Sequence, residues 1–277
     1  MQASIVVLLL VTATAWACQT SPPDGSPDPA WKLVWSDEFD GPDGAPVAAT
    51  RWSAVIGGDG WGNQEREYYT DRLTNVQQRT GNLVISAIKE PASAYSCWYG
   101  PCQYTSARLQ TKAHFDQLYG RFEARIKIPS GQGLWSAFWM LGSDIDSASW
   151  PNCGEIDIME NIGKEPSIVH ATLHGPGYSG TNGLTAADAL GGATFADDFH
   201  VFTVEWEKDV IRSYVDHTLY ETRTPADVPA GNHWVFDHPF FLLLNVAVGG
   251  NFPGDPDQTT IFPQTMLVDY VRVYRKA

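Results

Sequence analysis

Three carboxylic acids lie close together in residues 155–160, which have the sequence Glu-Ile-Asp-Ile-Met-Glu. Alternate residues of a strand point to opposite faces, so the first two acids would share one face and the two isoleucines the other. Regular alternation would then place Met159 among the acids and Glu160 among the isoleucines. A β-bulge absorbs one extra residue and would return Glu160 to the acidic face, and we predict such a bulge.

Acids gathered on one cleft wall repel each other when ionised and are rarely kept together without a task. Proton transfer is such a task. Retaining glycoside hydrolysis uses a carboxylate nucleophile and a protonated carboxylic acid roughly 5–5.5 Å apart. Glu155 and Glu160 could form this pair, and Asp157 could hydrogen-bond the nucleophile and help to set its protonation. The alternatives are a solvated strand face and a calcium site built from acidic residues.

This segment resembles the active-site strand of glycoside hydrolase family 16, in the bulged form of its laminarinase-like endo-β-1,3-glucanases. Met159 distinguishes it from the shorter form of lichenases and xyloglucan-active relatives. The resemblance extends from residues 35–41 to residues 268–274. It implies a retaining endo-glycosidase that hydrolyses internal bonds of laminarin-type β-glucans. In that mechanism Glu155 is the nucleophile, Glu160 the acid/base and Asp157 a supporting residue, whereas spacing alone is symmetric between the two roles.

Two other functions stay open. A galactan-active member of the family, such as an agarase or carrageenase, would share the bulged motif. A non-catalytic β-glucan recognition protein would share the fold. Relatives of the second kind usually lack the catalytic glutamates, and this sequence has both Glu155 and Glu160.

Composition narrows the class of protein. The 277 residues suit one all-β sandwich, and we find no internal domain boundary. The 11 tryptophans exceed what a core of this size needs, so some are expected to face a ligand such as a sugar ring. The net charge of −14 argues against a nucleic-acid partner, because no basic stripe is present to replace phosphate counterions. A neutral glycan is compatible with this charge.

The N-terminal residues resemble an export segment. Residues 1–17 contain a short apolar run and end in Ala-Trp-Ala, which favours a signal peptide. The run is too short to span a bilayer as a helix, so we predict no transmembrane segment. Residues 18–30 form a linker rich in Pro, Ser, Asp and Gly, and residues 31–277 form the catalytic domain. We expect a secreted monomer, with a lipid anchor at Cys18 as the less favoured alternative.

Short strands separated by turn residues follow from position 31 onward. The clearest strands are Asn82–Ala87, Gly120–Pro129, Val201–Trp206, Val210–Val215, Phe240–Val248 and Met266–Tyr274. Residues 207–209 and 216–217 resemble hairpin turns, and no segment favours an amphipathic helix longer than a turn or two. The fold class is therefore all-β. The family resemblance refines it to a concanavalin A-like β-jelly roll of two curved antiparallel sheets, with a glycan cleft on the concave face.

Aromatic residues near the acids are candidate sugar contacts. Residues 131–142 resemble the family's tryptophan-rich strand beside the catalytic one, and Trp135 and Trp139 share a face because they are four residues apart. Trp150 resembles the stacking residue near the cleavage point. The resemblance places His174 to hydrogen-bond sugar or the catalytic acid, although a lone histidine is more often structural.

Three polar residues complete the expected substrate contacts. Residues 61–71 resemble a laminarinase signature with two consecutive asparagines, of which this chain keeps Asn63 and has Gln64 in place of the second. Arg108 matches a cleft arginine of the family. Asn245 is the polar exception in an apolar strand, so it needs a partner inside the fold or in the cleft.

The cysteines suggest one disulfide. Cys97 and Cys102 enclose a turn-rich loop, and this spacing permits a small disulfide loop in an exported protein. We favour that bridge over two free thiols. Cys153 has no evident partner or base and is expected to be a buried free thiol. No Cys/His spacing indicates zinc, and no glycine-rich loop indicates a phosphate site.

We expect no cofactor for catalysis. The resemblance does imply a structural calcium ion on the convex face, bound by the carboxylates of Glu38 and Asp269 and a backbone carbonyl near Gly81. The alternative is that both carboxylates face solvent or pair with Arg272 or Lys276.

Overall fold

The computed structural model describes residues 30–277. The expected signal peptide at 1–17, the expected anchor at Cys18 and all of the linker except Ala30 lie outside the described residues. Helical structure in the described part is confined to α1 (Ile145–Ala148), η1 (Gly180–Asn182) and η2 (Pro225–Asp227). None of these helices is long and apolar enough to cross a membrane.

The strands form two sheets. The ten-stranded sheet contains β1 (Trp31–Asp37), β3 (Glu67–Tyr69), β4 (Val76–Gln78), β5 (Leu83–Cys97), β6 (Gly100–Ser106), β8 (Gly120–Lys127), β13 (His200–Glu207), β14 (Val210–Val215), β15 (Thr218–Arg223) and β17 (Gln264–Lys276). The seven-stranded sheet contains β2 (Ser53–Ala54), β7 (Arg108–Gln110), β9 (Leu134–Gly142), β10 (Glu155–Ile162), β11 (Ile168–His174), β12 (Leu184–Ala189) and β16 (Phe240–Val248).

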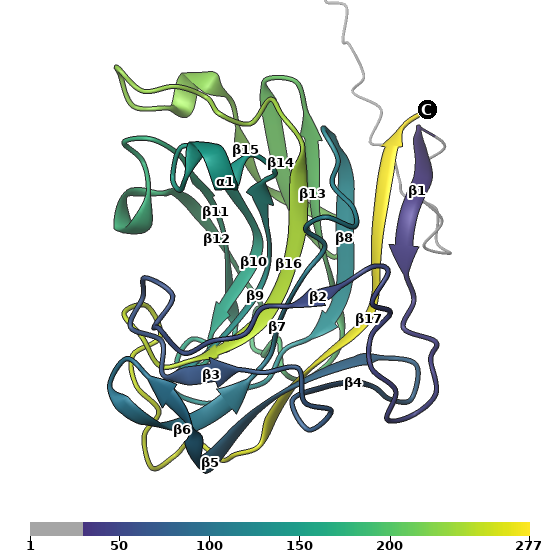
Figure 1. Cartoon of the computed structure of the whole chain (residues 1–277). Helices are drawn as coiled ribbons and strands as arrows, with labels where there is room; N and C mark the ends of the chain where they lie inside the picture. The colour runs from purple at the N-terminus through teal and green to yellow at the C-terminus, as the bar shows by residue number, and fades with distance from the viewer. Residues whose placement is uncertain (1–29) are drawn as a thin grey trace, which may run out of the picture.

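The two sheets stack face to face, and Figure 1 shows β9, β10, β11 and β12 of the seven-stranded sheet to the left of β8, β13 and β17 of the other. Its order is β12-β11-β10-β9-β16-β7-β2, and the main path of the other sheet is β15-β14-β13-β8-β17-β5-β6-β3. Among the described strands every pairing is antiparallel except that of β3 with β6. This arrangement confirms the predicted all-β jelly roll.

Side-chain alternation along the central strands separates the core from the opposite face. In β16, Phe240, Leu242, Leu244, Val246 and Val248 all belong to the core between the sheets. The intervening side chains therefore lie on the other face of the seven-stranded sheet, because strand residues alternate. This alternation places Asn245 on the face away from the core.

The strand predictions agree best where apolar runs are continuous. The predicted strands Val210–Val215 and Phe240–Val248 match β14 and β16 at both ends. β5 begins near the predicted Asn82 but continues to Cys97, well beyond the predicted end. In the predicted turn at 216–217 both residues have positive φ, 46° and 72°, as a type I′ hairpin turn requires.

A disulfide joins Cys97 at the end of β5 to Cys102 in β6. It closes the hairpin that these two strands form. Cys153 is fully buried and free, as expected. Burial raises the pKa of its thiol to about 11, so the thiolate needed for nucleophilic attack is disfavoured.

Candidate active site

β10 carries the three acids, and its pairing is irregular where the bulge was predicted. Against β9 the register skips Ile158, and against β11 it shifts between Asp157 and Glu160. Ile158 and Met159 consequently both point into the core, where Met159 is fully buried. The bulge confirms the sequence prediction and returns Glu160 to the face that carries Glu155.

Glu155 lies at the start of β10 beside an exposed indole. Nε1 of Trp150 donates a hydrogen bond of 2.7 Å to Oε2 of Glu155, while Oε1 lies 4.0 Å from Nε2 of His174. Trp150 is 45% exposed, although it is held by this hydrogen bond. An apolar ring face is therefore presented next to a partly buried carboxyl group, where a sugar ring could pack.

Glu160 is held from both neighbouring strands. Nε1 of Trp135, in β9, donates to Oε1 at 3.1 Å, and the hydroxyl of Thr172, in β11, donates to Oε2 at 3.4 Å. The edge of Trp135 also packs against Phe252, with ring centroids 5.5 Å apart. These contacts fix the orientation of a carboxyl group that is only 8% exposed.

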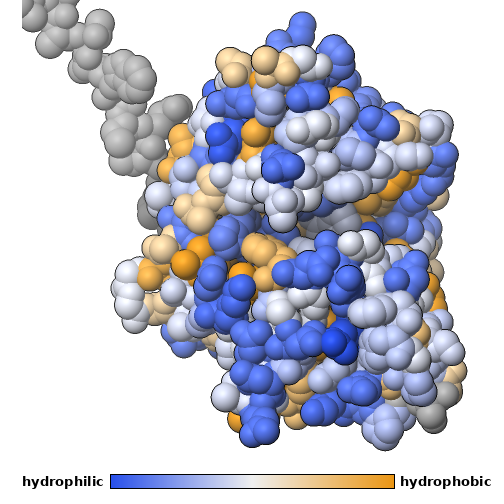
Figure 2. Space-filling model, turned by 90° about the vertical axis from the view of Figure 1, so that its left-hand side faces the viewer, coloured by the Kyte–Doolittle hydropathy of each residue, from blue (hydrophilic) through white to orange (hydrophobic). Residues whose placement is uncertain are grey.

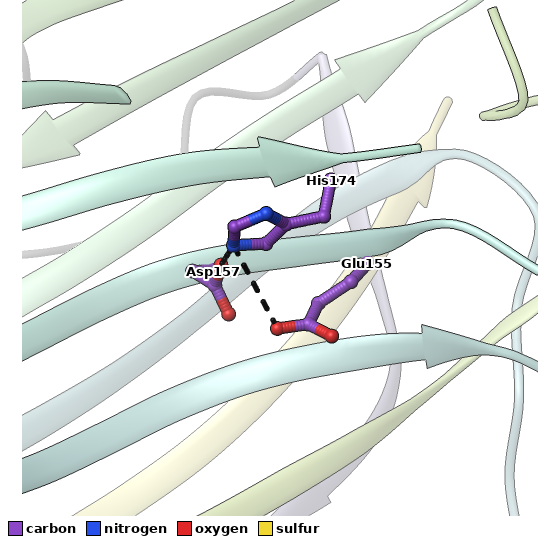
Figure 3. A group of neighbouring side chains, drawn as sticks. All are labelled: Glu155, Asp157 and His174. Carbon is purple, nitrogen blue, oxygen red and sulfur yellow. Dashed lines mark ion pairs between the residues drawn. The ribbon is translucent and has the colours of Figure 1, made fainter. Parts of the chain in front are cut away.

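Asp157 lies between the two glutamates in sequence and contacts a histidine from β11. Nε2 of His174 is 3.2 Å from Oδ2 of Asp157, and Figure 3 shows the imidazole facing both Asp157 and Glu155. One ligand atom from each of these three residues lies within 4.8 Å of the others. Calcium prefers oxygen ligands, so the imidazole nitrogen makes this group a poor match for the calcium alternative at this strand.

Burial raises the pKa of all three acids. Burial, and after it the charge of Asp157, raises the pKa of Glu155 to about 8, against the opposing effects of His174 and Trp150. Burial raises the pKa of Glu160 to about 7, again opposed by His174. For Asp157, burial and the charge of Glu160 raise the pKa well above its usual range. At neutral pH the cluster therefore retains protons that three exposed acids would have lost.

A second group of predicted contacts lies on β7, β9 and β16. The guanidinium of Arg108 is sandwiched between two indole rings, 4.9 Å from the centroid of Trp61 and 4.7 Å from that of Trp139. Nε1 of Trp139 donates to Oδ1 of Asn245 at 2.7 Å, and Nδ2 of Asn245 donates to the hydroxyl of Tyr69 at 3.2 Å. Asn245 thus has the partners that its apolar strand required.

Sequence reasoning missed Glu65, which connects this second group. Its carboxyl group is buried and accepts hydrogen bonds from Nδ2 of Asn63 at 3.2 Å and from the hydroxyl of Tyr69 at 3.0 Å. Through Tyr69 it reaches Asn245. The signal was present in part, since Glu67 and Tyr69 share one face of β3 and Glu65 continues the same alternation just before this strand begins.

Glu67 forms a buried pair with Glu65 and is fully buried itself. Its Oε2 accepts a hydrogen bond of 2.6 Å from the backbone N–H of Val248. Burial, and after it the charge of Glu65, raises the pKa of Glu67 well above the ordinary value. The folded protein therefore keeps a proton on Glu67 that the unfolded chain releases as the pH rises above about 4.5.

Glu67→Gln is expected to stabilise the protein at pH 8 and to change its stability little at pH 4. The raised folded-state pKa makes the wild type lose stability as the pH rises above 4.5, by up to about 1.4 kcal/mol per pH unit. Glutamine keeps an acceptor for Val248 and has no proton to retain. Urea unfolding at both pH values measures the difference, with Glu165→Gln, at a half-exposed side chain, as the control. A gain of equal size at both pH values would contradict the assignment.

The carboxylates expected to bind calcium are engaged with arginines. Glu38 accepts two hydrogen bonds from Arg272, at 3.0 and 2.7 Å, and Asp269 accepts one from Arg125 at 2.8 Å. The hydrogen bonds of Arg272 are the largest cause of the lowered pKa of Glu38. In this arrangement the two carboxylates are not free to bind a metal. Both ion pairs would have to break before Glu38 and Asp269 could bind one calcium ion.

The calcium ion on the convex face stays a prediction. Calcium that binds only the folded chain would raise the melting temperature. Melting temperatures measured in calcium and in chelator test this prediction. A rise that Asp269→Ala abolishes would place the ion at Asp269, and equal temperatures would reject the site.

The two groups of candidate residues lie on one face of the molecule. The first consists of Glu155, Asp157, Glu160, Trp135, Trp150 and His174, and the second of Asn63, Arg108, Trp139 and Asn245. The space-filling view in Figure 2 shows a hollow that crosses this side of the molecule. The candidates for the convex-face metal site belong to neither group.

Comparison with known protein families identifies the family. The sequence model of glycosyl hydrolases family 16 matches residues 63–272, a span that contains all ten residues of these two groups. The chain belongs to family 16 of the glycosyl hydrolases and is a glycoside hydrolase.

Known members of the family are similar over most of the described domain. The β-glucanase of Rhodothermus marinus is 44% identical over 258 residues, covering 89% of this chain and 86% of that protein. The endo-β-1,3-glucanase structure from Pyrococcus furiosus is 48% identical, with a TM-score of 0.84, and covers 89% of this chain and 95% of that one. The laminarinase catalytic domain of Thermotoga maritima MSB8 is 47% identical, with a TM-score of 0.83, and covers 89% and 99% respectively.

Proposed function

We propose that this protein is an endo-β-1,3-glucanase that hydrolyses internal bonds of laminarin-type β-glucans with retention of configuration. The observation that carries the proposal is the bulged β10, which holds Glu155 and Glu160 on one face with Asp157 between them. The names of the similar glucanases and laminarinases support the β-1,3-glucan as substrate.

In the first step, the carboxylate of Glu155 attacks the anomeric carbon while the bond to the glycosidic oxygen breaks. Glu160 gives its proton to that oxygen. Because its pKa is raised to about 7, Glu160 is protonated below neutral pH and can act as this acid. Glu155 must be ionised at this moment. Burial and the charge of Asp157 raise the pKa of Glu155 to about 8, and the neighbouring His174 and the hydrogen bond from Trp150 oppose this rise and favour the ionised form that the step requires.

Asp157 has a supporting role in the same step. Its deep burial favours the protonated form, which can donate a hydrogen bond to the ionised Glu155. The proton on Asp157 thereby stabilises the nucleophile in its charged state.

In the second step, the ionised Glu160 takes a proton from water, and the oxygen of this water attacks the anomeric carbon. The ester bond to Glu155 breaks, and the two inversions together retain the configuration. Trp135 and Thr172 hold Glu160 in place for both proton transfers. Neither residue has to move between the steps.

The substrate would be positioned by ring faces and by paired polar groups. Trp150 offers an exposed indole beside Glu155, and the sandwiched Arg108 offers donors in a fixed orientation. Asn63 and Asn245 are oriented by Glu65 and by the hydroxyl of Tyr69. Pre-oriented hydrogen-bonding groups lose little entropy when they bind sugar hydroxyls.

Release of reducing sugar from laminarin, lichenan, agarose and carrageenan tests the substrate class. We expect hydrolysis of laminarin. Hydrolysis of agarose or carrageenan alone would indicate a galactan-active enzyme, and laminarin binding without release would indicate a recognition protein. Proton NMR of the first products tests the stereochemistry: β-anomers appearing first support retention, and α-anomers would reject the nucleophilic role of Glu155.

A further inference from the structure

A cavity of about 270 Å³ lies beside the two groups of candidate residues, and no step of the proposed mechanism uses it. Its lining comprises two glycines and the side chains of Gln64, Arg66, Trp98, Asn251 and Asp255. We call it the Trp98 pocket. Trp98 is 47% exposed, so half of a large apolar ring faces solvent.

The exposed indole of Trp98 is held firmly. Its Nε1 donates a hydrogen bond of 2.7 Å to the backbone carbonyl of Glu65, and its backbone N–H donates to the carbonyl of Gly58 at 2.9 Å. It follows Cys97, whose disulfide closes the β5–β6 hairpin. A side chain at Gly60 would come within 2.8 Å of the ring. A ring fixed in this way can bind a flat ligand at little entropic cost.

The polar groups of the pocket favour a neutral ligand. Arg66 and Asp255 neutralise each other in an ion pair, in which Nη2 of Arg66 lies 2.7 Å from Oδ2 of Asp255. The side chains of Gln64 and Asn251 are exposed amides, each with donors and an acceptor. Sugar hydroxyls need both kinds of partner, and the apolar C–H face of a sugar ring packs on indole.

The Trp98 pocket is continuous with the expected substrate contacts. The backbone N–H of Asn251 donates to the carbonyl of Asn63 at 2.7 Å. Glu65 orients Asn63 with its carboxyl group and anchors Trp98 with its carbonyl. A side chain at Gly250 would come within 2.8 Å of the carbonyl oxygen of Asn63, so glycine allows the two segments to approach closely.

We propose that the Trp98 pocket is a distal subsite, which binds one sugar unit of a β-glucan chain whose cleaved bond lies at Glu155 and Glu160. The sugar ring packs on Trp98, and its hydroxyls bond to Gln64 and Asn251. This inference rests on the proposed function. The subsite makes the enzyme favour long chains, because only these reach from the two acids to the pocket.

The test compares kcat/KM for laminarin with kcat/KM for a β-1,3-linked trisaccharide. Trp98→Ala is expected to lower the ratio of the two constants roughly five- to tenfold, the scale of one aromatic contact. Asn251→Ala, which leaves the disulfide hairpin untouched, should lower it in the same direction. Leu219→Ala, an equally exposed residue on β15, is the control and should leave the ratio as in the wild type.

Binding to the Glu155→Gln variant separates this inference from the proposed function. Calorimetry with a hexasaccharide and a trisaccharide measures the gain in affinity with chain length, which Trp98→Ala should reduce in that background. An unaltered ratio and an unaltered gain in both Trp98→Ala and Asn251→Ala would reject the subsite alone. Failure of the wild type to hydrolyse laminarin would reject the proposed function.

Discussion

Glu155→Gln is expected to lower kcat on laminarin by about four orders of magnitude or more, as loss of a catalytic nucleophile generally does. An amide has nearly the volume of the carboxyl group and can still accept the hydrogen bond from Trp150. It cannot form the ester intermediate. The purified variant should therefore keep its melting temperature and bind laminarin. A kcat within tenfold of the wild-type value would remove Glu155 from its role.

A smaller side chain sharpens this test. Glu155→Ala leaves space for azide, which can attack the anomeric carbon in place of the missing carboxylate and give an α-linked sugar azide. The same anion added to Glu160→Ala should instead give the β-linked product, because Glu155 has already inverted the centre once. Glu165→Gln, on the turn after β10, serves as the matched control for both variants and should retain wild-type turnover. A β-linked azide from Glu155→Ala together with an α-linked azide from Glu160→Ala would instead make Glu160 the nucleophile and Glu155 the acid/base.

Glu160→Ala is expected to slow laminarin hydrolysis by about 10²- to 10⁴-fold, the usual contribution of a positioned acid. The loss should be far smaller for formation of the glycosyl-enzyme from an aryl glycoside with a good leaving group, because such a group departs without a proton. Pre-steady-state release of the phenol measures that step. An equal loss on both substrates would argue against the acid role.

The pH dependence gives the same residue a second signature. An acid catalyst works while protonated, and burial has raised the pKa of Glu160 from its ordinary 4.5 to about 7. Glu155 has to be ionised at the same time, and its pKa is raised to about 8, so the wild-type kcat/KM should be highest between about pH 7 and 8, with Glu160 responsible for the fall at higher pH. In Glu160→Ala this fall should be absent for the aryl substrate. A persisting fall at the same pH would assign it to another group.

Sequence alternation sufficed to predict the arrangement of β10, because its faces are set locally. Two acids and two isoleucines alternate, and only the position of Glu160 required the bulge. β16 was equally predictable, since a continuous apolar run between turn residues predicts a buried strand. The end of β5 could not be predicted, because Pro91 interrupts the pattern while the strand continues into a hairpin that a disulfide closes.

Long-range polar contacts were only partly open to sequence reasoning. The pairing of Glu38 with Arg272, which is 234 residues away, was named as an alternative to calcium binding, but no local pattern selected it. Gln64 is a different case, because its φ of 59° belongs to the left-handed region that asparagine enters more readily. The signature has a second asparagine where this chain has Gln64. The preference of asparagine for positive φ explains why asparagine suits that position. Glu65 was overlooked because its connection to Asn245 runs through the hydroxyl of Tyr69, and the sequence does not show that β16 lies beside this segment.

The bulge in β10 also determines where this chain can tolerate an indel. Loss of one residue from a strand normally sends every later side chain to the opposite face. Here the register with β9 skips Ile158, and Ile158 and Met159 both point into the core. Deleting either one would therefore regularise the ladder and leave both glutamates facing the substrate. The loss would be confined to packing, at about 2–5 kcal/mol for one large buried side chain.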